Sequence, residues 1–284
     1  MKQNEDNTNR IDIDKAWNAL YTRLEAERLL SVEPEESSYG KRKIPLGWIA
    51  AAAVICLGII FSVFYFSQSG KQSLLVLQNN DNAGTLVATL EDGSTVYLAS
   101  HASISYPAAF DTNQRKVKLN GDALFSVTKD AKRPFVVETD KGITVEVVGT
   151  IFAVKSSPGN PFELSVKQGK VNVLDKDNQT KVFVEAGEIV RLNPDGLSKS
   201  KITNPQTFGR FANKMSFKDE KLNNIVQAIN TVYGSPAIIA DKSLDNRTLT
   251  VTFENDSVEA MTELICLALN LERVNKQDTI FIRK

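Results

Sequence analysis

The sequence predicts a membrane-anchored multidomain protein, with a short cytoplasmic α-helix, one transmembrane helix, an all-β periplasmic domain and a small α+β C-terminal domain. Three observations predict this fold class. An uncharged apolar run about as long as a membrane span lies near the N-terminus. Short alternating strands separated by glycine turns fill the middle of the chain. Strand and helix periodicities then alternate from residue 210 onward.

Changes in composition and periodicity divide the 284 residues into six predicted segments. In chain order they are a cytoplasmic helix and tether (1–43), a transmembrane helix (44–67), a linker (68–83), the all-β domain (84–195), a second linker (196–209) and the α+β domain (210–284).

The composition excludes several classes of function. Lys and Arg together number 34, as do Asp and Glu, so no net positive charge favours direct binding of nucleic acid. Cys56 and Cys266 are the only cysteines, which excludes a disulfide framework and a cysteine-based metal site. The single histidine, His101, excludes most catalytic triads and multi-histidine metal sites. We therefore expect no metal, no cofactor and no enzymatic activity beyond the candidate self-cleavage described below.

The apolar run from Leu46 to Phe66 is the predicted membrane span. More than forty residues precede it, and it is longer than the apolar core of a cleaved signal peptide. Lys41, Arg42 and Lys43 flank its N-terminal end, whereas Lys71 is the nearest basic residue on the other side. Because flanking basic residues stay in the cytoplasm, we expect a single-pass inner-membrane protein with a cytoplasmic N-terminus and a periplasmic C-terminus.

A short amphipathic helix is predicted near the N-terminus. Its apolar face consists of side chains at helical spacing, namely Ile13, Trp17, Leu20, Tyr21 and Leu24. A helix this short builds no core of its own, so this face must be covered. One possible cover is the inner leaflet of the membrane, which the acidic residues of the helix disfavour. The other is a groove on a soluble partner, with Trp17 as the anchor.

Between residues 84 and 193 the chain alternates apolar and polar residues in short strands. Turn dipeptides separate these strands at Asp92-Gly93, Asn120-Gly121, Lys141-Gly142, Gln168-Gly169 and Ala186-Gly187. No long helical pattern interrupts the stretch. It predicts an all-β sandwich, a jelly roll or a short solenoid.

The C-terminal segment contains a pseudo-repeat with an offset of 36 residues. The matching positions are Phe217, Leu222, Ile225, Ile229 and Tyr233 in the first copy and Phe253, Val258, Met261, Ile265 and Leu269 in the second. In each copy a strand ending in Phe leads through an acidic turn into a helix and a further strand. A small domain with two helices on one face of a sheet is expected.

Ordered motifs in the β segment resemble the FecR-type sigma regulators. The motifs are EDGSTVYL at 91–98, SISYP at 103–107, RKVKLNGDALFSV at 115–127, RPFVVET at 133–139, VEVVGTIFAV at 145–154 and VKQGKVNV at 166–173. Asp122 and Ala99 stand where that family more often has Glu and Asn. The C-terminal segment resembles the secretin and TonB short N-terminal-type domain found at the end of many FecR-like chains.

This resemblance implies a transmembrane anti-sigma factor or sigma regulator. The apolar face of the N-terminal helix would hold an extracytoplasmic-function (ECF) sigma factor in the cytoplasm. The periplasmic part would receive a signal from the signalling domain of an outer-membrane TonB-dependent transporter. Two alternatives stay open. One is a membrane-anchored periplasmic binding or scaffold module of an envelope complex. The other is a carbohydrate-active enzyme, for which the sequence offers no convincing carboxylate pair.

Gly149-Thr150 is a candidate self-cleavage site, because some FecR-like proteins cleave themselves at such a pair in this motif. The Thr hydroxyl would attack the Gly carbonyl, and water would open the resulting ester. The alternative is a glycine bulge with a purely structural role.

Overall fold

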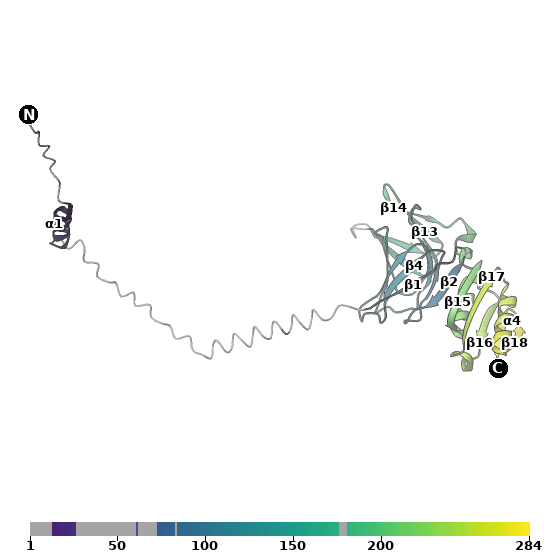
Figure 1. The fold of residues 1–284 in the computed structure, drawn as a ribbon. Helices are drawn as coiled ribbons and strands as arrows, with labels where there is room; N and C mark the ends of the chain where they lie inside the picture. The colour runs from purple at the N-terminus through teal and green to yellow at the C-terminus, as the bar shows by residue number, and fades with distance from the viewer. Residues whose placement is uncertain (1–12, 27–60, 62–72, 83, 176–180) are drawn as a thin grey trace, which may run out of the picture. The chain divides into compact units, whose positions relative to one another are not determined.

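The computed structural model describes residues 13–26, 61, 73–82, 84–175 and 181–284 (Figure 1). Contacts divide the chain into two units, Met1–Ser69 and Gly70–Lys284, and each is described by itself. In the first unit, helix α1 spans Ile13–Ala26, as the sequence predicts. The predicted membrane span lies outside the described residues except for position 61. Among the residues that are described, no helix is long and apolar enough to cross a bilayer.

Two β-sheets packed face to face form the larger part of the second unit (Figure 1). The first sheet has the strand order β1-β4-β5-β7-β8-β11-β12. Its strands are Leu74–Gln78 (β1), Ser103–Pro107 (β4), Arg115–Asn120 (β5), Phe135–Thr139 (β7), Thr144–Val147 (β8), Lys170–Leu174 (β11) and Lys181–Glu185 (β12).

The second sheet has the order β14-β13-β10-β9-β6-β3-β2-β15-β17. The strands that face the first sheet are Thr85–Thr89 (β2), Ala123–Ser126 (β6), Thr95–Leu98 (β3), Ile151–Lys155 (β9), Glu163–Gln168 (β10), Glu188–Asn193 (β13) and Gly196–Lys201 (β14). A large mostly-β domain is thus confirmed.

The core between the sheets is built by the alternation that the sequence shows. Phe125 and Phe152 face each other from adjacent strands, with ring centroids 5.2 Å apart, and Phe135 approaches Phe125 from the opposite sheet at 6.1 Å. All three are fully buried. The turn at Gly121 needs a glycine, because its φ is +95° and a Cβ there would lie 2.9 Å from the Ala102 Cα.

A buried ion pair closes one end of this core. Arg115 Nη1 lies 2.6 Å from Asp92 Oδ2, and both side chains are almost fully buried. Arg115 Nη1 also donates to the Thr128 carbonyl at 2.9 Å, and its Nε donates to the Arg133 carbonyl at 2.9 Å. The sequence indicated only a tight turn at Asp92, so this pairing is a finding of the structure.

The C-terminal segment forms an α+β part with two helices. Its elements are Lys214–Lys221 (β15), Leu222–Tyr233 (α3), Ala237–Ala240 (β16), Thr248–Glu254 (β17), Val258–Leu269 (α4), Glu272–Lys276 (β18) and Thr279–Arg283 (β19). Strands β16, β19 and β18 form a third sheet in that order. The predicted arrangement of both helices on one sheet is therefore only partly correct, because the strands divide between two sheets.

The pseudo-repeat is visible as a pairing of equivalent residues. Strands β15 and β17 run antiparallel, and the Phe217 and Phe253 rings lie 6.0 Å apart in an edge-on arrangement. The hydroxyls of Ser216 and Thr252, also 36 positions apart, lie 3.0 Å from each other. One difference is local: β15 continues through the predicted acidic turn, with an irregular register between Phe217 and Glu220.

The α+β part is joined to the β sandwich by a continuous sheet. Strand β15 pairs in parallel with β2, with Met215 opposite Thr85 and Phe217 opposite Val87. The outer face of the second sheet thereby enters a second core beneath α3 and α4. The sandwich contributes four buried side chains to this core, from Val87, Tyr97, Leu124 and Ala153.

Two segments that the sequence predicts as linkers contain strands. Strand β14 lies within 196–209 and pairs with β13, and β1 lies within 68–83 and pairs with β4. The sequence of β14, GLSKSK, is polar because the strand lies at an exposed sheet edge, and a polar sequence of this kind predicts a loop. Sequence periodicity detects a strand through its buried face, and this strand buries little.

Candidate functional site

The apolar face of α1 is exposed along the described helix. Trp17 is 57% exposed and Tyr21 59% exposed, and Leu20 is exposed beside them. At 100° per residue these positions and Leu24, which is half-buried, lie within one stripe. Ile13 begins the helix at the expected position. The structure therefore brings Trp17, Leu20, Tyr21 and Leu24 onto one face.

The charged residues at the two ends of α1 suit the helix dipole. Asp14 lies in its first turn and Arg23 in its last, where each complements the helix dipole. On the opposite face the Thr22 hydroxyl donates to the Asn18 carbonyl at 2.7 Å. An exposed aromatic stripe with a polar opposite face can bind in an apolar groove.

The Gly149-Thr150 pair lies in the connection between β8 and β9, not within a strand. A Cβ on Gly149 would lie 2.7 Å from the Lys129 Cα, so the close approach of two backbones requires glycine here. Thr150 is buried, and its hydroxyl donates to the Lys170 carbonyl at 2.9 Å. A carbonyl oxygen is not a general base, so this contact positions the hydroxyl without activating it. The structure does not test self-cleavage, and Gly149-Thr150 stays a candidate pair.

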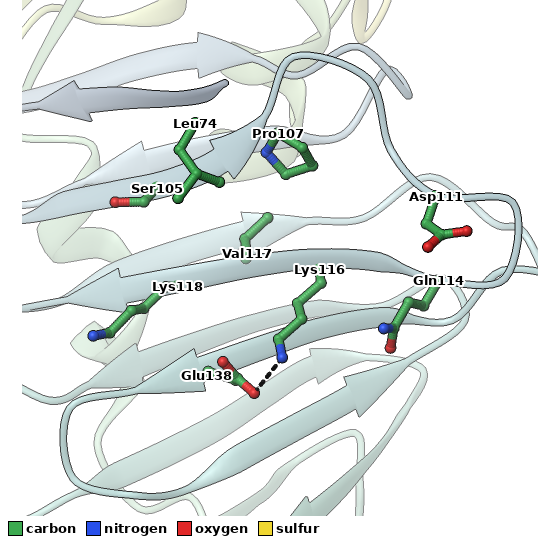
Figure 2. A pocket seen from close by; sticks show the side chains of 9 residues that line it. All are labelled: Leu74, Ser105, Pro107, Asp111, Gln114, Lys116, Val117, Lys118 and Glu138. Carbon is green, nitrogen blue, oxygen red and sulfur yellow. Dashed lines mark ion pairs between the residues drawn. The ribbon is translucent and has the colours of Figure 1, made fainter. Parts of the chain in front are cut away.

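A shallow pocket of about 390 Å³ lies on the outer face of the first sheet (Figure 2). Leu74 of β1 and Pro107 of β4 supply its apolar side. Lys116 of β5 forms an ion pair with Glu138 of β7, at 2.7 Å, on the other side. Sequence reasoning missed this pocket, because it is assembled by the non-local pairing of β1 with β4.

A charged cluster joins the sandwich to the segment that leads into the α+β part. Asp122 accepts hydrogen bonds from the backbone N–H groups of Ser156 and Ser157 and from the Ser157 hydroxyl, at 2.8–3.0 Å. Arg210 Nη1 lies 3.1 Å from its other oxygen. Burial alone would raise the pKa of Asp122, but the hydrogen bond from Ser157, the charge of Arg210 and the other donors together lower it.

The described residues contain no cluster of three or more His, Cys, Asp or Glu side chains that could hold a metal ion. Cys266 is buried in α4, and burial raises the pKa of its thiol. A buried thiol with a raised pKa is a poor nucleophile.

These features define a class of protein: a β sandwich fused to a small α+β repeat through a shared sheet, with an exposed amphipathic helix in a separate unit. Two family models match the chain. The model described as FecR protein matches residues 81–172, and the model described as FecR, C-terminal, matches residues 214–282. Together they match more than half of the sequence, and the chain belongs to the FecR family. Neither description names an enzymatic activity.

Solved structures give a weaker likeness. Two crystal structures of a candidate anti-sigma factor from Parabacteroides distasonis ATCC 8503 are 23% identical to this chain, with TM-scores of 0.46 and 0.45. Each alignment covers 74% of this chain and 99% of the other. No match is found among curated proteins. The identity and TM-scores are too low for the function of that protein to be inferred for this chain.

Proposed function

We propose that this chain is a single-pass inner-membrane anti-sigma factor or sigma regulator. Helix α1 holds an ECF sigma factor in the cytoplasm. The unit Gly70–Lys284 receives a periplasmic signal from the signalling domain of a TonB-dependent transporter in the outer membrane. Membership of the FecR family supports the proposal, and the observation that carries it is the exposed face of α1.

The cytoplasmic half rests on the chemistry of that face. Trp17 and Tyr21 are large, stiff side chains that lose little conformational entropy on binding, and such residues dominate binding energy when they enter a groove. In the described structure nothing covers them. A sigma factor whose polymerase-binding surface lies under this helix would be unable to engage the polymerase.

The periplasmic half rests on the α+β part. Helix α4 exposes two large apolar side chains one turn apart, Leu264 at 44% and Leu267 at 73%, and an exposed apolar helix face can bind a partner protein. The arrangement supports protein recognition by this part of the chain. The run Leu46–Phe66 supplies the apolar length that the proposed membrane anchor needs.

The test is capture of cytoplasmic proteins by the full-length chain, with wild type compared against Trp17→Ala. We expect an ECF sigma factor, identified by mass spectrometry, to bind the wild type. Truncation of an anchoring Trp costs about 2 kcal/mol or more, so its affinity for Trp17→Ala should be roughly 30-fold weaker. Thr22→Ala, on the polar side of the same helix, is the matched control and should bind as the wild type does.

Two outcomes would contradict the proposal. Equal capture by Trp17→Ala and the wild type would show that this face is not the binding surface. Recovery of the chain only with lipid would show that α1 lies on the membrane surface. The interpretation as a periplasmic scaffold module would then replace the interpretation as a sigma regulator.

A further inference from the structure

Strand β1 is an edge strand with an unusually apolar surface. In the described part of the chain no strand pairs with its outer side. Leu74 is 65% exposed, Leu75 46% and Val76 66%, and the strand LLVLQ contains no charged residue. An exposed apolar edge with free backbone groups is a template for pairing with another strand.

The other free edges are protected. Strands β12, β14, β17 and β18 each carry at least one charged residue. Strand β16 is uncharged, but it has only four residues and lies between Pro236 and Asp241. Charges, Pro and short length are the devices by which sheets prevent edge pairing. Because β1 has none of these devices, we expect its edge to pair with another strand.

The core of the sandwich is also partly exposed to solvent at β1. Leu77 packs against the core and lies opposite the buried Ile104. By the alternation of a strand, Leu75 shares that inner side, whereas Leu74 and Val76 face outward. Leu75 is therefore a core-facing side chain, and no described strand lies beyond it in the sheet.

A second copy of the same strand fits this edge. Two copies that pair antiparallel are related by a two-fold axis. If their sheets are to join with both cores on the same side, one residue of each strand must lie at that axis. A pairing shifted by one residue would turn the core-facing side chains of one copy to the opposite face. Val76 is the central residue of β1. With Val76 at the axis, Leu75 lies opposite the Leu77 of the second copy on the core side.

The charges near this edge do not oppose such a pair. Strand β4 is uncharged, and on β5 Lys116 is paired with Glu138 at 2.7 Å and Lys118 with Asp140 at 3.5 Å. The nearest lysines are thus neutralised within each copy, as Figure 2 shows for Lys116. Along the described strands β1, β4 and β5, two copies therefore meet with apolar surface, and the lysines of β5 each have a carboxylate partner.

The short segment between the predicted membrane span and β1 would keep the β1 edges of two copies at a similar distance from the bilayer. Leu74 follows Phe66, the end of the apolar run, by eight positions, which span at most about 28 Å. In a membrane-anchored chain this tether confines β1 to a thin layer above the bilayer, which raises the effective concentration of one edge for another. Only this step rests on the proposed membrane anchoring.

From these observations we infer that β1 is a homodimer interface, in which two copies pair β1 antiparallel about Val76 and join their first sheets into one. The test is disulfide cross-linking of the full-length chain in its membrane, in a Cys56→Ala, Cys266→Ala background that carries Val76→Cys. Residues opposite each other in an antiparallel pair have Cα atoms about 4.5–5.5 Å apart, within disulfide range. Mild oxidation should give a species of twice the chain mass.

Two variants make the test specific. Phe183→Cys, an exposed apolar position on β12 at the other edge of the same sheet, should give at least tenfold less dimer. Adding Leu75→Lys to the Val76→Cys chain should reduce its cross-linking by at least tenfold, because the charge would enter the shared core.

Three outcomes would overturn the inference: no dimer from Val76→Cys, equal dimer from Phe183→Cys, or cross-linking of Val76→Cys to a different protein. Sigma-factor capture through Trp17 is unaffected by any of them, so the two proposals fail separately.

Discussion

Arg115 and Asp92 show how one residue pair can decide the stability of the sandwich. The guanidinium is buried and depends on the Asp92 carboxylate and two backbone carbonyls for its hydrogen bonds. We expect Asp92→Asn to leave a buried charge without its counter-charge and to lower the free energy of unfolding by about 3–5 kcal/mol. Urea unfolding followed by far-UV circular dichroism measures this, because both tryptophans lie outside the sandwich.

The matched control is an exposed ion pair on the same sheet. Glu138→Gln removes the partner of Lys116, and both side chains of that pair are largely exposed. Exposed pairs contribute under about 1 kcal/mol. A loss from Asp92→Asn no larger than that from Glu138→Gln would show that the buried pair has no special role.

The Gly149-Thr150 pair gives a second prediction at the scale of residues. If the hydroxyl attacks the Gly149 carbonyl, then Thr150→Ser keeps the cleavage and Thr150→Val removes it. If glycine is needed only for the approach to Lys129, all three chains stay intact, and Gly149→Ala is destabilised because of the 2.7 Å contact. Since Thr150 Oγ1 contacts only a carbonyl oxygen among its described partners, we expect intact chains. Intact-mass measurement after prolonged incubation checks this, and fragments ending at Gly149 would contradict it.

At the scale of elements, the Asp122 cluster ties the β5–β6 turn to the end of β9 and to the segment holding Arg210. Because the pKa of folded Asp122 is lowered, its contribution to stability is full above the unfolded value of about 3.9 and is lost as the pH falls through the lower folded value. We expect Asp122→Asn to destabilise the chain by about 1–3 kcal/mol at neutral pH. The difference from the wild type should shrink below pH 4.

Urea midpoints of the two chains between pH 7 and pH 2.5 test this dependence. A difference that stays constant across the range would mean that the carboxylate charge makes no contribution. Asp140→Asn is a suitable control, since Asp140 makes only a long, exposed pair with Lys118.

Sequence reasoning was successful for elements whose signal is local. The turn glycines at 93, 121, 142, 169 and 187 all have positive φ. The repeat positions Ile225, Ile229, Met261 and Ile265 are buried as well. These predictions hold because alternation, helical spacing and positive φ are each written in a few neighbouring residues.

Non-local features could not be predicted in the same way. The pairing of β15 with β2 joins residues about 130 positions apart, and no local pattern specifies which strand lies beside which. The Asp92–Arg115 pair and the pocket beside Leu74 have the same origin. For the candidate site, the sequence located the face of α1 through helical spacing, whereas the exposed edge of β1 emerged only from the sheet order.

For the whole molecule, the shared sheet makes the sandwich and the α+β part a single folded body. Tyr97, fully buried on β3, donates its hydroxyl to the Ala228 carbonyl of α3 at 2.9 Å. Lys167 of β10 donates to the Thr231 carbonyl at the end of the same helix at 2.6 Å. Under the proposed function, a signal received by the α+β part would pass to the sandwich through the continuous backbone pairing of β15 with β2.

The shared sheet and shared core of the two parts predict the effect of removing the α+β part. A chain ending at residue 203 would leave Val87, Tyr97, Leu124 and Ala153 uncovered and make β2 a free edge. Exposed apolar patches and bare edges cause aggregation, so we expect this chain to bind a hydrophobic dye and to lose its cooperative thermal transition. A chain starting at residue 27 is the control and should melt as the full chain does, because α1 belongs to the other unit. A truncated chain that melts cooperatively at the full-length temperature would mean that the two parts fold independently, and transmission through the shared sheet would then have to be replaced by a hinged arrangement.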